Sequence, residues 1–329
     1  MTTYTGTMGN NQAAGKLSTD NLMIGDASDL SAATGGKDIL AGGSSYKSGT
    51  ITNDIYGDGV NLSNSTGGLD VLAGGSSLLF GTVVNNLYGD GQKLVGSTGG
   101  WDALTGGSTV LSGTVQNVLF GDGREMVNSN GGNDALIGGS TAVGGKVTNL
   151  LYGDAFTLTN SAGKIDVLTG GSSFGGGNVT NELYGDGNAL IGSQGGADVI
   201  AGGSSFAGGT VTNLIYGDAV TADAASDCGN DVITSGLRAT DIIWGDAQNV
   251  SSGGHDVFVF GGTFGNDKIM DFRQLEDIMT FKVTGVSSVA DLGFSHNGAG
   301  DVVITAGGYG TVTLVGVTDI NPDLCILVA

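Results

Sequence analysis

One segment repeats along most of this chain at an interval of 32 residues. The segment reads TGGLDVLAGGSS at residues 66–77, and close copies of it precede and follow. Its aspartate recurs at Asp38, Asp70, Asp102, Asp134, Asp166 and Asp198, and the next copy, Asp231, comes after 33 residues. A constant period of this length is typical of solenoids, in which each repeat covers the apolar face of its neighbour.

A second motif with the same period lies between these copies. It reads NDIYGDG at residues 53–59, and its asparagine and aromatic positions, Asn53 and Tyr56, recur in later repeats. Its aspartate recurs at Asp26, Asp58, Asp90, Asp122, Asp154, Asp186 and Asp218. In a solenoid, residues one period apart stack on one another. We therefore expect columns of identical side chains along the axis, with a packing role for the aromatic column.

The repeats have the periodicity of β-strands. In residues 82–88, TVVNNLY, the side chains of Val83, Asn85 and Leu87 alternate with a second set, and we predict that these three face inward. Glycine pairs bound each such run, and no apolar stripe has helical spacing. The sequence therefore predicts an all-β fold, a parallel β-solenoid of the β-roll or β-helix kind with about seven 32-residue repeats.

The repeats divide the chain into three parts. Residues 1–20 are polar and lack periodicity, which predicts a flexible or loosely docked arm. Residues 21–254 hold the repeats, and their spacing shortens after Asp231, so the solenoid should narrow there. Residues 255–329 differ in character and end in an apolar stretch, which predicts a C-terminal β cap. The two cysteines, Cys228 and Cys325, could be free thiols or one disulfide.

The charge of the chain excludes several classes of function. The 11 Lys and Arg residues against 32 Asp and Glu residues give a formal net charge of −21. Nucleic acids and anionic membranes attract clustered basic residues, which this chain lacks. No apolar run is long enough to cross a bilayer, and no basic and apolar leader follows Met1. We expect neither nucleic-acid binding nor membrane insertion, and a cation is the natural partner.

The two aspartate columns pose an electrostatic problem. Carboxylates stacked about 4.8 Å apart repel by about 0.9 kcal/mol in water and by about 3.5 kcal/mol at an effective dielectric constant near 20. Either the carboxyl groups take up protons or cations lie between the turns. Oxygen ligands beside glycine carbonyls suit calcium, whereas zinc and copper favour His and Cys. A third alternative is that the carboxylates only accept hydrogen bonds from turn amides.

Several of these segments resemble a known family. GGLDVLAGG around Asp70, GGNDALIGG around Asp134, GNDVI around Asp231 and GNDKI around Asp267 are similar to the RTX, or haemolysin-type, calcium-binding repeats of proteins exported by bacterial type I secretion. The two halves of each repeat are longer than the family's unit of about nine residues. The resemblance implies that calcium binds the aspartates of the first motif from Asp38 to Asp231, those of the second motif from Asp58 to Asp218, and Asp267.

The same resemblance implies a secreted protein of the cell surface or extracellular space. Residues 255–329 are similar to the C-terminal region that the type I exporter recognises. Such a chain folds when it meets calcium outside the cell. The regularity of the repeats favours a structural, surface or matrix protein over an enzyme, and its N-terminal rung is expected to support self-association.

Other functions are alternatives to this interpretation. Thr50, Thr82, Thr114 and Thr210 could form an ice-binding row, but Lys146 and Asn178 occupy two of its positions. An adhesin built on the solenoid is a second alternative. A polysaccharide-modifying enzyme is a third, although catalysis requires non-repeating acids and bases gathered in a groove. His255 and His296 lie outside the regular repeats, where a structural role is expected.

Overall fold

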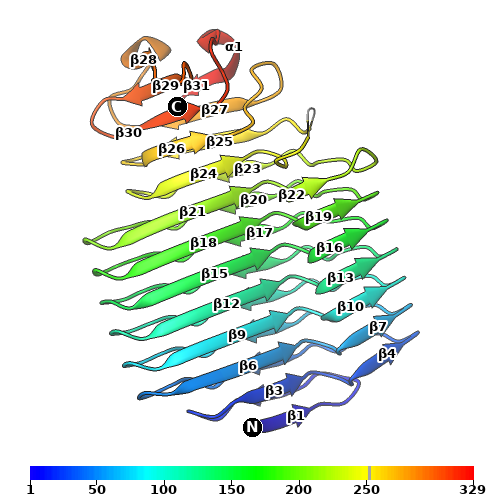
Figure 1. Cartoon of the computed structure of the whole chain (residues 1–329). Helices are drawn as coiled ribbons and strands as arrows, with labels where there is room; N and C mark the ends of the chain where they lie inside the picture. Colours follow the sequence, from blue (N-terminus) through cyan, green and yellow to red (C-terminus); the bar gives the residue numbers. More distant parts are fainter. Residues whose placement is uncertain (251–252) are drawn as a thin grey trace.

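The chain winds into a stack of coils, and each regular coil contributes one strand to each of three sheets (Figure 1). The computed structural model describes residues 1–250 and 253–329. In one coil, the long strand β9 (Thr82–Tyr88) is followed by the shorter β10 (Gly91–Val95) and then by β11 (Ala103–Thr105). This arrangement confirms the predicted all-β parallel solenoid with a 32-residue repeat.

Sheet A contains the long strands and extends from one end of the molecule to the other. Its strands in spatial order are β1 (Thr2–Thr5), β3 (Asn21–Ile24), β6 (Thr50–Tyr56), β9, β12 (Thr114–Phe120), β15 (Lys146–Tyr152), β18 (Asn178–Tyr184), β21 (Thr210–Tyr216), β24 (Thr240–Trp244), β26 (Gly265–Ile269), β30 (Gly310–Leu314), β29 (Val302–Ala306) and β28 (Leu292–His296). All pairs up to β30 are parallel, and the last two pairs are antiparallel.

Sheet B contains the short strands. Its strands are β2 (Gln12–Ala14), β5 (Ile39–Ala41), β8 (Val71–Ala73), β11, β14 (Ala135–Ile137), β17 (Val167–Thr169), β20 (Val199–Ala201), β23 (Val232–Thr234), β25 (Val257–Gly261), β27 (Ile278–Lys282) and β31 (Ile326–Val328). Sheet C contains β4 (Asp29–Ser31), β7 (Asn61–Ser63), β10, β13 (Gly123–Val127), β16 (Ala155–Thr159), β19 (Gly187–Ile191) and β22 (Ala219–Ala222).

Neighbouring coils pair with a register of one full repeat. Asn85 therefore lies opposite Asn53 on one side and opposite Asn117 on the other. The predicted inward set is confirmed, because Val83, Asn85 and Leu87 are all fully buried. This register converts each repeated residue into a column that runs along the solenoid.

The aromatic residues that follow the inward set form a continuous stack on the opposite side of sheet A. The stack is Tyr56, Tyr88, Phe120, Tyr152, Tyr184, Tyr216 and Trp244, with ring centroids 4.6 to 5.1 Å apart. Outward residues such as Val118 and Leu150 pack against it. Because the rings cover one another's faces, the stack rigidifies the sheet and leaves little ring surface for a ligand.

Residues 1–20 differ from the expected loose arm. They form β1 and β2, which pair in parallel with β3 and β5 and so add a further turn to the solenoid. Tyr4 and Ala13 pack against the main core from these strands. The backbone of the first regular coil offers unpaired groups, and this segment satisfies them despite its polar sequence.

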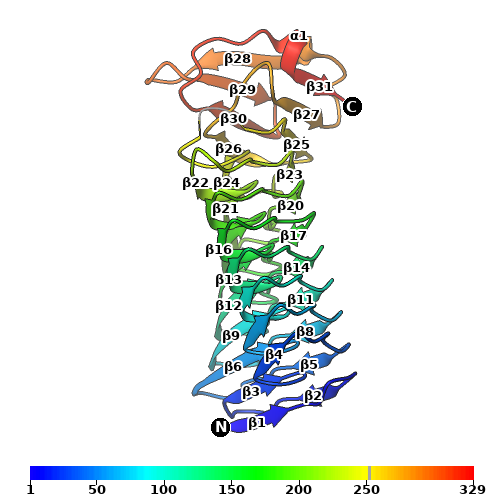
Figure 2. The same cartoon turned by 90° about the vertical axis from the view of Figure 1, so that its right-hand side faces the viewer.

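The solenoid narrows toward its C-terminal end, as the sequence spacing predicts. The registers of β23 with β25 and of β25 with β27 correspond to steps of 25 and 21 residues in place of 32. Among the described residues, sheet C ends at β22, so later turns lack its strand. The antiparallel strands β28 to β30, the 3₁₀ turn Val289–Asp291 and the short helix α1 (Pro322–Cys325) close this end (Figure 2).

Two further sequence questions are answered by the structure. Cys228 and Cys325 are both free thiols. The described residues include no helix of sufficient length and apolar character to span a bilayer.

Candidate functional site

The aspartate before each short strand of sheet B points into the solenoid and belongs to a buried column, which we call the first column. It consists of Asp38, Asp70, Asp102, Asp134, Asp166, Asp198 and Asp231, and the structure extends it to Asp256 and Asp277. Each member is at most 3% exposed. The sequence analysis identified the first seven members as metal ligands, and the structure brings all seven together.

From Asp38 to Asp256, only one oxygen of each carboxyl group in the first column is hydrogen-bonded. The main-chain N–H of Asp70 donates to Oδ1 of Asp102 at 2.6 Å, and that of Asp102 donates to Oδ1 of Asp134 at 2.7 Å. The buried Oδ2 atoms have no hydrogen-bond partner from Asp38 to Asp256. Amide contacts therefore account for half of the acceptor capacity of these groups, and the other half calls for a cation or a proton.

A second buried column comes from the Gly-Asp pair at the end of each long strand. It consists of Asp26, Asp58, Asp90, Asp122, Asp154, Asp186 and Asp218, and the structure adds Asp246. Apart from Asp154, these carboxyl groups accept N–H bonds from glycines, such as Gly68 to Asp58 at 2.8 Å and Gly196 to Asp186 at 2.7 Å. Unpartnered buried oxygens remain on Asp58, Asp122, Asp154, Asp186 and Asp218.

The glycine of each Gly-Asp pair lies where the free oxygens converge. A Cβ atom built on Gly57 would lie 1.7 Å from the carbonyl oxygen of Gly89 and 2.1 Å from Oδ2 of Asp70. The same pair of oxygens surrounds Gly121, with Gly153 and Asp134 as their sources. A side chain is therefore sterically excluded here, and each coil presents a carboxylate oxygen and a carbonyl oxygen at one point.

Burial makes ionisation of these carboxyl groups unfavourable. It raises the pKa of Asp70 to about 9, with a further contribution from the charge of Asp58. Burial likewise raises the pKa of Asp58 to about 7, although hydrogen bonds from Asp90 and Gly68 oppose the shift. In the middle of the stack, burial and the neighbouring aspartates raise the pKa of Asp102 well above its ordinary value. Near neutral pH, the carboxyl groups of both columns therefore need bound protons or cations to neutralise their charge.

The N-terminal end of both columns is capped by neutral donors. Asn11 takes the register position of a first-column aspartate, and its side-chain Nδ2 donates to Oδ1 of Asp38 at 3.1 Å. The N–H of Gly9 donates to Oδ1 of Asp26 at 3.0 Å. Sequence analysis missed this cap, although GNNQAAG at residues 9–15 aligns with GKDILAG at residues 36–42.

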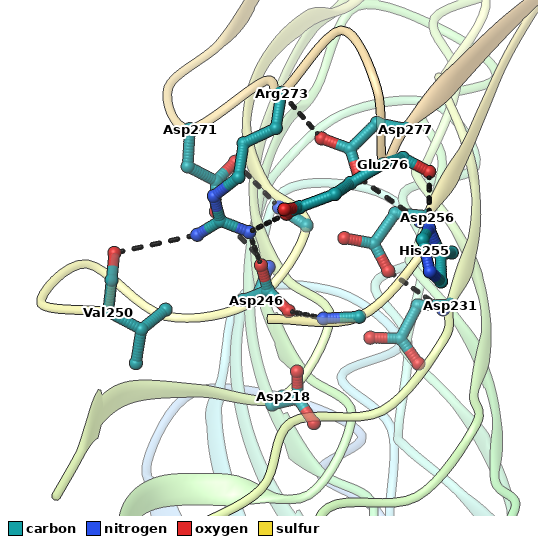
Figure 3. A network of polar contacts seen from close by, with 12 residues as sticks. Asp218, Asp231, Asp246, Val250, His255, Asp256, Asp271, Arg273, Glu276 and Asp277 are labelled. Carbon is teal, nitrogen blue, oxygen red and sulfur yellow. Dashed lines mark hydrogen bonds and ion pairs between the residues drawn. The ribbon is translucent and has the colours of Figure 1, made fainter. Parts of the chain in front are cut away.

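The C-terminal end of the columns has a positive charge of its own (Figure 3). The guanidinium group of Arg273 lies 2.5 Å from Oδ2 of Asp246, and its main-chain N–H donates to Asp277 at 2.7 Å. Asp271 accepts the N–H of Asp246 at 3.1 Å. Across the part of the chain that the structure describes, Arg273 is the one basic residue that pairs with a column aspartate. Sequence analysis did not single it out.

Asp267, the remaining predicted ligand, lies apart from both columns. It ends a column of asparagines, Asn21, Asn53, Asn85, Asn117, Asn149, Asn181 and Asn213, that continues through Asp241. The N–H of Asp241 donates to Oδ1 of Asp267 at 3.1 Å, and Oδ2 of Asp267 has no hydrogen-bond partner. Burial and the charge of Asp241 raise the pKa of Asp267 to about 9.

Most of the negative charge of the protein is inside it. Nineteen aspartates are buried, out of 32 acidic residues in the chain. The remaining 13 acidic residues face 11 basic ones, so the rest of the molecule carries a formal charge of only −2. Residues 251–252 are serines, and the count therefore covers every acidic residue. A charge of this size in the interior is compatible with folding only if protons or cations neutralise most of it.

The donor set fits a hard divalent cation. The free donors of the columns are carboxylate and carbonyl oxygens, which calcium and magnesium prefer and which calcium accepts in flexible arrangements. One thiol adjoins them: Cys228 lies near Asp218 and Asp246, and burial beside these aspartates raises its pKa, which disfavours the thiolate form.

No family model and no curated protein sequence matches the chain.

Proposed function

We propose that this chain is a calcium-dependent structural protein of the cell surface or extracellular matrix. The observation that carries the proposal is the set of buried carboxylate oxygens without a partner, repeated in every coil at one place. A fold with this interior is unstable at neutral pH unless cations enter, and extracellular calcium is abundant. Folding is thereby coupled to location.

Calcium would be held by the free Oδ2 atoms of the first column, the free oxygens of the second column, and the glycine carbonyls between them. Bound calcium would supply the positive charge that, among the described residues, Arg273 alone brings to a column. The protein supplies oxygen donors at a constant interval, so the binding free energy contributes directly to the free energy of folding. The same oxygen donors recur in each coil from Asp38 to Asp198, which predicts several calcium ions per chain.

A structural role agrees with the polar groups outside the columns. Nδ1 of His255 lies 2.9 Å from the carbonyl oxygen of Glu276, and Nε2 of His296 lies 3.1 Å from that of Thr318. Each histidine is thus engaged with the main chain of the C-terminal cap. These contacts are consistent with a structural role for both histidines in the cap of a scaffold.

Equilibrium dialysis with calcium tests the proposal directly. We expect the full chain to bind several calcium ions at neutral pH and Asp102→Asn to bind fewer, because it replaces one free carboxylate oxygen. Asp54→Asn is the matched control, since Asp54 lies on the outside of β6 and should leave the number of bound ions unchanged. A wild-type chain that binds no calcium would contradict the proposal.

Export by a type I system is part of the same proposal. Its support is the similarity of residues 255–329 to the C-terminal region of such exported proteins, together with a fold that would form only after calcium is met. Removal of these residues should abolish secretion from a host that carries a type I exporter. Secretion at the normal level by the truncated chain would contradict this part, and the calcium measurement would be unaffected.

A further inference from the structure

The outer face of sheet B is a flat surface without acidic residues. It consists of the first and third residues of each strand from β5 to β23, and of the residue two positions before each strand. None of these positions is buried, and Lys37 is the only charged residue among them. In a chain with 32 acidic residues, a face of this extent without any of them is distinctive.

Large apolar side chains are exposed along this face. Trp101 is 63% exposed, Ile165 is 56% exposed, Val167 is 46% exposed and Val199 is 43% exposed. Because neighbouring strands pair in full register, the first residues of the strands form one continuous column of Ile, Val and Ala side chains. Exposed apolar patches on monomers seldom exceed about 300–600 Å², and larger ones mark interaction sites.

The dimensions of the face match those of a protein interface. Seven strands at a spacing of about 4.8 Å extend about 34 Å along the solenoid axis. With a width of about 20 Å along the strand direction, the face presents roughly 600–700 Å². Stable interfaces bury about 600–1,000 Å² on each partner. Figure 2 shows the strands β5 to β20 along one side of the solenoid.

We propose that the outer face of sheet B binds the same face of a second copy of the chain in a twofold dimer. A twofold axis brings the same face of both copies together, and the continuous apolar column of first strand residues in one copy can pack beside that of the other, as in two-layer β-sandwiches. Charge does not oppose the contact, because the exterior carries a formal charge of only −2. This last argument rests on the proposed function, in which cations neutralise the interior.

Sedimentation velocity of the full chain in calcium tests the dimer. We expect the wild type to be dimeric at micromolar concentration and both Ile165→Lys and Val199→Lys to raise the dimer dissociation constant at least tenfold, since each buries a charge at the contact. Lysine is tolerated at the register position of Ile165, which Lys37 occupies in an earlier coil. Thr210→Lys on sheet A is the matched control, because Lys146 occupies its column.

The outcomes separate this inference from the proposed function. A wild type that is folded in calcium but monomeric at high micromolar concentration overturns the dimer and leaves calcium-dependent folding intact. Dimers that persist unchanged in both lysine variants place the interface elsewhere and also overturn it. A monomer whose thermal hysteresis is lost in both lysine variants would assign the face to ice instead. A chain that folds without calcium and still dimerises through this face would contradict the proposed function and leave the dimer intact.

Discussion

The asparagine column and the first aspartate column pass through the same coils at the same interval, yet only the asparagine column is chemically complete. Asn85 accepts the N–H of Gly75 at 2.8 Å, donates to the carbonyl oxygen of Gly75 at 2.9 Å, and donates to Asn117 at 2.8 Å. Asp102 accepts one N–H, and its Oδ2 accepts nothing. An amide ladder satisfies itself, whereas a carboxylate ladder needs an external partner.

The C-terminal end shows what such a partner does. Arg273 places a positive charge against Asp246 there, and the adjoining carboxyl groups of Asp271 and Asp277 receive main-chain N–H donors. The regular coils hold equally buried aspartates and no basic side chain among the described residues reaches them. The comparison indicates that the repeats leave to a cation the role that Arg273 performs at the end.

The largest expected effect is a pH dependence of the metal-free chain. The folded-state pKa is raised to about 6 for Asp38, about 7 for Asp58, about 8 for Asp256 and about 9 for Asp70. Because each lies above the unfolded value, the stability that these groups contribute is present below about pH 4 and is lost as the pH rises through 6 to 9. Protonation of the columns at acid pH should therefore stabilise the metal-free fold, as calcium does at neutral pH.

Circular dichroism of the chain in chelator, measured from acid to alkaline pH, checks this dependence. We expect the β signal to disappear as the pH rises through that window, and calcium should restore it at the upper end. A β signal that is constant with pH would show that the buried carboxyl groups need neither protons nor calcium for folding.

Removal of the one built-in cation should have the next largest effect. Arg273→Gln leaves Asp246 buried without its partner, and we expect the free energy of unfolding in calcium to fall by about 3–5 kcal/mol. The exposed Arg238 provides the control, and Arg238→Gln should change stability little. Urea denaturation measures both. If the two variants are equally stable, the ion pair between Arg273 and Asp246 does not stabilise the end of the column.

A charge placed in the asparagine column should be less costly but clear. Asn85→Asp removes the donors to Gly75 and Asn117, leaves the carbonyl oxygen of Gly75 without its partner and buries a charge, which we expect to cost about 1–3 kcal/mol or more. Amide hydrogen exchange should show the loss in the coils on both sides, because the ladder connects them. An unchanged exchange pattern in β6 and β12 would mean that the columns are not energetically continuous.

The smallest effect should come from the reverse exchange, Asp102→Asn. The new side chain still accepts the N–H of Asp70 and no longer buries a charge. In chelator at neutral pH we expect it to stabilise the chain by about 1 kcal/mol or more, because a carboxyl group whose pKa burial raises well above its ordinary value is removed. In saturating calcium the sign should reverse because a ligand is lost. Stabilisation of equal size under both conditions would count against cation binding.

The repeat length, the parallel strands and both aspartate columns could be predicted from the sequence because each residue in them recurs at one interval. The strands of sheet C were not separated from the rest, since runs such as Asn61–Ser63 are too short to show alternation. Asn11 and Arg273 occur once each, at turns of a different length, so periodicity could not reveal them. Their roles depend on contacts between coils, which only the structure shows.

Far-ultraviolet circular dichroism of the wild-type chain at neutral pH, first in chelator and then with calcium added, tests the central claim most directly. The buried aspartates predict a largely disordered chain in chelator and a cooperative gain of β structure as calcium binds. Magnesium at equal concentration should act more weakly, because it requires a stricter ligand geometry. A full β spectrum in chelator at neutral pH would contradict the claim that cations complete this fold.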